Sequence, residues 1–321
     1  MTRGSTPIVR NVSLTFRGGE LVLLLGPSGS GKSTLLRAMN GFRPGVGRVT
    51  VDGQDLYACF DTLKRSIGYV PQDDVLHASL TVRQALDYAA RLRLPEMQDG
   101  ARAAELTRVI AEVGLAERRD VRVRHLSGGQ RKRVSVAMEL LAKPALFFLD
   151  EPTSGLDPGL EAQVMALLRR LTTDERFTLV TTHVVTSSSL ADLAVFMAKG
   201  RVVYVGPPVD ASGFFGVDSL AEIYSVIARD EDAWARRFES SSLFRTYVVD
   251  RPRVVGEFGS SLGASVGAPS LRTPSAMAMA GAEPSTIAES AAIGELGEVT
   301  PEQELARLKA ELRARRDEHD G

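Results

Sequence analysis

Apolar positions follow two different periods along this chain. Short apolar or alternating runs predict strands at 20–25, 48–51, 67–70, 145–149, 177–182, 193–197 and 201–205, with a looser alternation over 8–16. Between residues 80 and 141 the spacing changes to three and four residues, which indicates helices. Strands that alternate with helices favour an α/β core. We expect residues of about 75–142 to form an inserted helical subdomain.

The pattern changes again after residue 210. Residues 211–252 carry apolar and aromatic residues at helical spacing, so we expect a helical extension that packs on the core. Gly, Ala, Ser and Pro dominate residues 253–298, which predicts a flexible, disordered linker because little apolar surface is available for burial. Residues 299–321 predict a short helix, since Thr300 suits an N-cap and Gln303 completes a capping box. A solvated helix and a docking or self-association helix both fit this last segment.

The amino-acid composition argues against several classes of function. The 321 residues are 44% hydrophobic and 25% charged with a net charge of −1, so no basic field marks nucleic acid as a partner. The single cysteine, Cys59, excludes an internal disulfide framework and fits a reducing compartment. We expect neither a signal peptide nor a transmembrane segment, because the N-terminus lacks an apolar core and no apolar run reaches 18 residues.

A glycine-rich loop follows the apolar strand at 21–25. The stretch LVLLLGPSGSGKST contains G-x-x-x-x-G-K-[ST] between a predicted strand and a predicted helix. Glycines let backbone N–H groups close around phosphate oxygens, and the helix N-terminus adds partial positive charge. Lys32 can reach the β- and γ-phosphates and Ser33 can ligate Mg²⁺. We therefore expect a nucleoside triphosphate to bind Gly26, Pro27, Ser28, Gly29, Ser30, Gly31, Lys32, Ser33 and Thr34; a glycine-rich turn without a ligand is the alternative.

Two acids follow another core strand. The run Ala145–Leu149 ends in Asp150 and Glu151, and the carboxyl end of a core strand is where an α/β sheet presents ligands. Asp150 is placed to hold Mg²⁺, directly or through water, and Glu151 is placed to polarise an attacking water as general base. Two solvated acids at a strand end are the alternative.

A second anion-binding helix start is predicted at Ser127-Gly128-Gly129-Gln130, which precedes a helical run. This one has no loop lysine of its own. The order GPSGSGKS, YVPQDD, LSGGQ, LFFLDEP, SGLD and TTH resembles the nucleotide-binding subunit of an ATP-binding-cassette (ABC) transporter over residues 8–206. The resemblance implies a P-loop ABC ATPase core within residues 1–210, with a mixed sheet flanked by helices.

The resemblance also implies roles for particular residues. Gln72 would sense Mg²⁺ and the attacking water and would couple the site to a membrane partner through the helical subdomain. Ser127, Gly129 and Gln130 would contact ATP bound by the opposite subunit of a head-to-tail dimer, and Asp157 would act across the same interface. His183 would bind the γ-phosphate and order the water beside Glu151.

Longer stretches, including SGGQRKRVSVAMELLAKPALFFLDEPTSGLDP, resemble the G subfamily of ABC proteins. That likeness implies hydrolysis of MgATP that drives an ABC-2-type transmembrane domain or subunit, with the chain at the cytoplasmic face of a membrane and export as the direction. A soluble ABC ATPase acting on nucleic acid, ribosomes or an assembly complex is one alternative, and a scaffold that binds nucleotide without turnover is another. The chain departs from the family in one respect, because residues 1–15 contain no aromatic residue to stack on adenine. Apolar contacts or upstream sequence would then hold the base.

Overall fold

The computed structural model describes residues 2–3, 6–173, 175–251 and 276–280. The described residues all belong to one compact unit, which falls within residues 1–282. The helix expected at 299–321 and most of the linker expected at 253–298 lie outside the described residues.

A six-stranded mixed sheet forms the centre of the unit, with the order β11-β10-β4-β9-β8-β7. Five neighbouring strands are parallel, and β11 pairs antiparallel with β10. The strands are β4 (Leu21–Leu25), β7 (Ile67–Val70), β8 (Leu146–Asp150), β9 (Phe177–Thr182), β10 (Leu193–Ala198) and β11 (Arg201–Gly206). Each lies within one or two residues of a predicted strand. The expected α/β class with a mixed sheet is confirmed.

Alternation along the central strands produces two hydrophobic cores. In β4 every side chain is buried, and Leu21, Leu23 and Leu25 join one core while Val22 and Leu24 join the other. Successive side chains in a strand point to opposite faces, so an unbroken apolar run is what a sheet covered on both faces requires.

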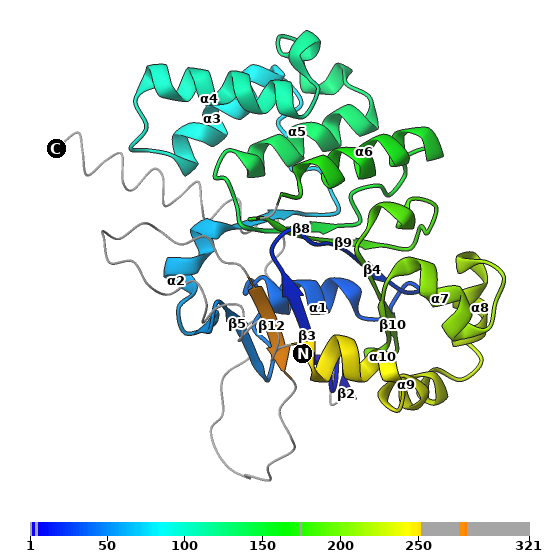
Figure 1. Cartoon of the computed structure of the whole chain (residues 1–321). Helices are drawn as coiled ribbons and strands as arrows, with labels where there is room; N and C mark the ends of the chain where they lie inside the picture. Colours follow the sequence, from blue (N-terminus) through cyan, green and yellow to red (C-terminus); the bar gives the residue numbers. More distant parts are fainter. Residues whose placement is uncertain (1, 4–5, 174, 252–275, 281–321) are drawn as a thin grey trace. The chain divides into compact units, whose positions relative to one another are not determined.

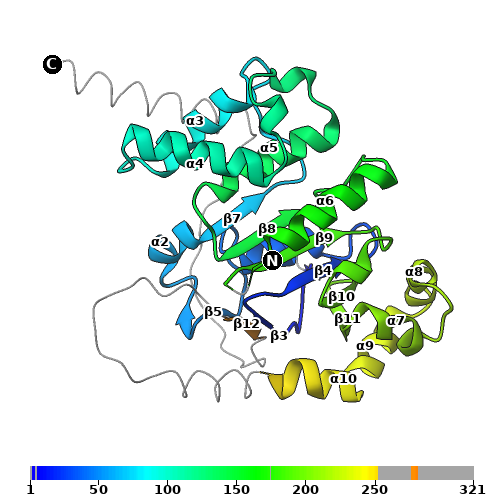
Figure 2. The ribbon, with the colours of Figure 1, turned by 45° about the horizontal axis from the view of Figure 1, so that its top comes forward.

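Helices cover the two faces of this sheet (Figures 1 and 2). Helix α1 (Lys32–Met39) lies on one face, and α5 (Gly128–Leu140) and α6 (Pro158–Leu171) lie on the other. Helices α3 (Val82–Arg93) and α4 (Asp99–Glu112) pack with α5 beyond the sheet, within the range for which the sequence predicts helices. Thr81 and Gln84 begin α3 with a capping box.

The predicted helical extension packs on the edge of the sheet. It contains α7 (Pro208–Phe215), α8 (Ile223–Ile227), α9 (Glu231–Glu239), α10 (Ser242–Phe244) and a π-helical turn, Arg245–Val249. Phe196 of β10 contacts Phe215 of α7 and Tyr224 of α8, with ring centroids 5.6 and 6.1 Å apart. Phe215 and Phe238 are buried, and the other aromatic residues of this segment pack partly buried against the cores, as the sequence indicates. Short elements connect these parts: α2 (Phe60–Leu63) and 3-10 turns at Lys64–Ser66, Ala116–Arg118, Val123–His125, Ser188–Leu190 and Leu220–Glu222.

A second, antiparallel sheet has the order β3-β12-β5-β6, and β1 (Thr2–Arg3) pairs separately with β2 (Thr6–Pro7). Its strands are β3 (Leu14–Arg17), β12 (Ala276–Ala280), β5 (Arg48–Val51) and β6 (Gln54–Asp55). The single strand suggested by residues 8–16 is wrong before Leu14, because Asn11 has a φ of 52° and breaks the extended backbone.

The expected linker at 253–298 also differs in part. Ala276–Ala280 forms β12 and pairs with both β3 and β5. The prediction of a linker rests on how little apolar side-chain surface this segment can bury. The strand is held instead by backbone hydrogen bonds to the edges of two strands, which would otherwise be unpaired.

Candidate functional site

The glycine-rich loop connects β4 to α1 at the carboxyl end of the parallel strands. Gly29 and Gly31 have φ of 79° and 101°, in the left-handed region that favours glycine. A Cβ on Gly26 would lie 2.5 Å from the carbonyl oxygen of Met197 in β10. Glycine at 26 therefore lets the loop leave β4 in direct contact with the neighbouring strand.

Lys32 is buried within this loop. Its Nζ donates to the carbonyl oxygens of Gly26 at 2.8 Å and Pro27 at 3.2 Å, and it lies 4.0 Å from Glu151 Oε1. Burial lowers the pKa of Lys32, while the charges of Glu151 and Asp150 act in the opposite direction. The ammonium group is thus bonded to its own loop and lies close to the carboxylate of Glu151.

Asp150, at the end of β8, accepts hydrogen bonds from two hydroxyl groups. Its Oδ1 accepts hydrogen bonds from Ser33 Oγ at 2.9 Å and Thr181 Oγ1 at 2.7 Å, and Arg37 lies 3.9 Å from Oδ2. A carboxylate beside a hydroxyl is a donor set that suits Mg²⁺, which normally combines one or two carboxylates with phosphate oxygens and water. Among the described residues no three His, Cys, Asp or Glu converge on one metal position. The residues therefore fit a Mg²⁺ ion that is held jointly with a nucleotide.

Glu151 lies at the centre of the remaining predicted residues. Its Oε2 is 3.5 Å from Gln72 Nε2 and 3.7 Å from His183 Nδ1, and its backbone has a φ of 43°. The backbone N–H of Glu151 donates to Thr181 Oγ1 at 2.8 Å, which holds this left-handed residue in place. The structure thus brings Lys32, Gln72 and His183 together around one carboxylate.

Lys32, Gln72 and Glu151 border a cleft of about 650 Å³. Its lining comprises Ile8, Ser28, Gly29, Gly31, Lys32, Ser33, Thr34, Gln72, Glu151 and Lys199. Ile8 and Lys199 were not predicted from the sequence, since they come from a loop and a turn whose place depends on the fold. Phe16 does not reach this cleft, because it is buried and stacks on Phe177 with centroids 5.0 Å apart.

Thr181 is a third residue that was not predicted from the sequence. It pairs with Asp150 in the parallel register of β8 and β9, and its hydroxyl bonds both Asp150 and Glu151. A threonine in an apolar strand gives no signal until the neighbouring strand is known.

Ser127, Gly129 and Gln130 of the LSGGQ motif, here called the signature residues, lie at the start of α5, the signature helix, and do not line this cleft. Ser127 is the N-cap, and its Oγ accepts from Gln130 N at 3.3 Å while Gln130 Oε1 accepts from Ser127 N at 3.1 Å. Gly129 is buried against Leu160, which a Cβ would approach to 3.4 Å. The start of α5 thus combines backbone donors with an exposed serine that caps the helix.

Asp157 caps a different helix. Its Oδ1 accepts from Gly159 N and Leu160 N, both at 3.0 Å, at the start of α6. The structure therefore places Asp157 outside the cleft of the same chain, like the signature residues.

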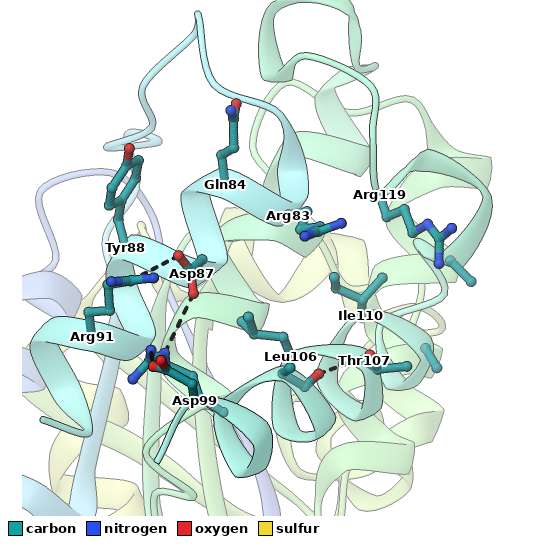
Figure 3. Close-up of a pocket in the computed structure, with 14 residues that line it drawn as sticks. Arg83, Gln84, Asp87, Tyr88, Arg91, Asp99, Leu106, Thr107, Ile110 and Arg119 are labelled. Carbon is teal, nitrogen blue, oxygen red and sulfur yellow. Dashed lines mark hydrogen bonds and ion pairs between the residues drawn. The ribbon is translucent and has the colours of Figure 1, made fainter. Parts of the chain in front are cut away.

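A second cleft of about 680 Å³ lies between α3 and α4 (Figure 3). Leu106 and Ile110 of α4 line it together with charged residues of both helices. Asp87 pairs with Arg91 at 3.0 Å and with Arg102 at 3.6 Å. Tyr88 on the same helix is 55% exposed, so the rim presents an aromatic side chain beside charges.

No helix within the described ranges is long and apolar enough to cross a membrane.

Comparison with known proteins identifies the family. Residues 9–154 match the ABC transporter family model. Over 238 residues the chain is 45% identical to the ABC transporter ATP-binding/permease protein Rv1747 of Mycobacterium tuberculosis, covering 73% of this chain and 28% of that protein. It is 39% identical over 220 residues to the broad substrate specificity ATP-binding cassette transporter ABCG2 of Bos taurus, and this match covers 65% of this chain and 33% of that protein. This chain therefore spans about a third or less of the length of these two relatives.

A solved structure agrees. The cbiO1 protein of Clostridium perfringens, part of the ABC transporter complex cbiONQ, superposes with a TM-score of 0.62 at 27% identity, covering 73% of this chain and 94% of that one. With the cleft bordered by Lys32, Ser33 and Glu151, these matches show that the chain contains the P-loop domain of the ABC transporter family, whose model spans residues 9–154.

Proposed function

We propose that this chain hydrolyses MgATP as the nucleotide-binding part of an ABC transporter related to the G subfamily, and that the work drives export through an ABC-2-type membrane partner. The observation that carries the proposal is the convergence of Lys32, Gln72 and His183 on Glu151 beside the phosphate-loop motif. The names of the relatives, which are transporters, support transport over a soluble role on nucleic acid or ribosomes.

The chain's own residues divide the work in the following way. The backbone N–H groups of residues 26–34, except Pro27, and the Lys32 ammonium would hold the triphosphate and stabilise charge on the transferred group. Ser33 and Asp150 would hold Mg²⁺, which neutralises phosphate charge when it is bound. Glu151 would take a proton from the attacking water, with Gln72 and His183 orienting that water through their contacts at 3.5 and 3.7 Å.

We also propose that the site is completed by a second copy or a paired cassette. Ser127, Gly129, Gln130 and Asp157 do not line the cleft of their own chain, yet Ser127 is exposed at a helix start suited to phosphate. In a head-to-tail dimer each signature helix would close the partner's cleft. A monomer would then bind ATP but hydrolyse it poorly.

The membrane partner is proposed to contact the α3–α4 cleft. A cytoplasmic helix of that partner would place an apolar side chain against Leu106 and Ile110 and polar groups against the charged rim of Figure 3. Replacing Tyr88 with Ala should weaken copurification with an ABC-2-type membrane protein. Val209→Ala, which truncates an even more exposed apolar side chain on α7, should not.

The deciding experiment replaces Glu151 with Gln. Phosphate release should fall to background, while ATP binding persists and ATP drives dimer formation in analytical ultracentrifugation. Glu117→Gln makes the same charge change at an exposed position and should keep full turnover. Substantial residual hydrolysis in Glu151→Gln would overturn the assignment of the general base.

A further inference from the structure

Lys132 of α5 has no part in the mechanism above, yet its ammonium group is buried and fully paired. The residue is 5% exposed, and Nζ lies 2.8 Å from Asp74 Oδ1, 3.0 Å from the carbonyl oxygen of Gln72 and 3.4 Å from that of Pro71. An ammonium has three donors, and the loop at 71–74 supplies three acceptors. Because a buried charge is costly unless it is paired, these bonds fix the lysine and the loop together.

A second bond joins the same helix to the same loop. Ser135 Oγ, three residues along α5, donates to Asp74 Oδ1 at 2.9 Å. Gln72 and Asp73 are themselves exposed, so their side chains give the loop no apolar anchor. Beyond the end of β7 at Val70, the backbone of Gln72 is therefore bonded to α5 through Lys132.

Helix α5 is also the helix that begins at Ser127. Lys132 lies five residues after Ser127 on one continuous helix, so the two move together. The contact between Gln72 Nε2 and Glu151 Oε2 is 3.5 Å, at the outer limit of a hydrogen bond, and a small shift of the loop would break it.

We infer that Lys132 is a positioning residue that ties Gln72 to α5, so that the approach of Gln72 to Glu151 depends on where α5 lies. This inference rests on the role proposed above for Gln72. If Ser127 contacts ATP held by a second copy, one rigid helix then links that ATP to the water-orienting group of its own cleft. Binding of ATP in the cleft of one copy would thus shift α5 of the other copy and change the distance between Gln72 and Glu151 there.

The test is a double-mutant cycle in the full chain. Lys132→Met removes all three bonds at similar length, and we expect kcat to fall about tenfold or more while the Kd for fluorescent ATP stays within about twofold. Gln72→Ala should lower kcat by a similar factor, and the double variant should lose no more than either single variant, since both remove one contact. Lys64→Met, which breaks an exposed pair with Asp61, serves as control and should keep wild-type kcat.

Lys132→Met leaves Asp74 without its cation, so stability must be separated from positioning. The variant Lys132→Met with Asp74→Asn removes both charges and should recover the thermal midpoint but not kcat. Recovery of kcat in this variant would overturn the inference. If the fold losses of kcat in Gln72→Ala and Lys132→Met multiply in the double variant, Lys132 does not act through Gln72. The inference is then wrong, while the role proposed for Gln72 stands. If Gln72→Ala keeps full kcat, the role proposed for Gln72 falls, and the inference falls with it.

Discussion

The Thr181 hydroxyl holds both acids of the site, so its removal should be costly. Thr181→Val keeps the branched shape but deletes the bond to Asp150 at 2.7 Å and the acceptor of the Glu151 N–H at 2.8 Å. An unpaired buried N–H costs about 1–3 kcal/mol, and the lost bond to a charged carboxylate adds about 1.5–3 kcal/mol before relaxation. Asp150 keeps its contacts with Ser33 and Arg37, so we expect a net loss of about 2–4 kcal/mol in the free energy of unfolding.

For a domain of this size, such a loss lowers the thermal midpoint by about 5–15 °C. Circular dichroism melts without nucleotide measure it, and turnover should fall as well because Glu151 loses the bond that holds its φ of 43°. Thr181→Ser keeps both hydrogen bonds and should cost only about 1 kcal/mol for the lost methyl group. A midpoint for Thr181→Val within about 2 °C of wild type, or an equal loss in Thr181→Ser, would refute this reasoning.

Three further predictions concern the loop, the signature helix and a buried acid. Gly26→Ala places a Cβ 2.5 Å from a backbone oxygen, so ATP affinity measured by fluorescence titration should fall, whereas Gly213→Ala, with open space around it, should leave affinity unchanged. Ser127→Ala should cost only about 1 kcal/mol in a thermal melt, the price of a helix cap, yet should abolish most ATP turnover; normal turnover would argue against the shared site. Burial raises the pKa of Glu139 above 4.5 despite its pair with Arg93, so the folded state keeps this proton to higher pH than the unfolded chain. Wild-type stability should therefore fall relative to Glu139→Gln as pH rises through the raised folded pKa. The thermal midpoint of wild type minus that of Glu139→Gln should be lower at about pH 8 than at about pH 5, and a constant difference would contradict this.

The central sheet could be predicted because its physical signal is local. Runs such as 21–25 and 145–149 are apolar at every position. Such a run indicates a strand that is buried on both faces, because neighbouring side chains point to opposite sides of the sheet. The glycine-rich loop could be located for a related reason, since strand, glycines, lysine and helix are contiguous in sequence.

The features of the site and fold that could not be predicted depend on contacts with residues that are distant in the sequence. Thr181 acquires its importance from a register with Asp150, 31 residues away, and Lys132 from a loop 60 residues upstream. The strand Ala276–Ala280 is determined by two strand edges more than 200 residues before it. Conversely, the alternation at 8–16 suggests a strand that a single left-handed residue, Asn11, interrupts.

The central claim is that a cleft built around Lys32 is completed by Ser127 of another copy, and mixing two inactive variants tests it most directly. Lys32→Ala destroys the loop half of the site, and Ser127→Arg blocks the exposed signature half. A mixed head-to-tail dimer contains one intact site, so an equal mixture should recover up to about a quarter of wild-type ATP turnover although each variant alone is inactive. If the mixture stays as inactive as its components, or if either variant alone turns over ATP at the wild-type rate, the account of a shared site is contradicted.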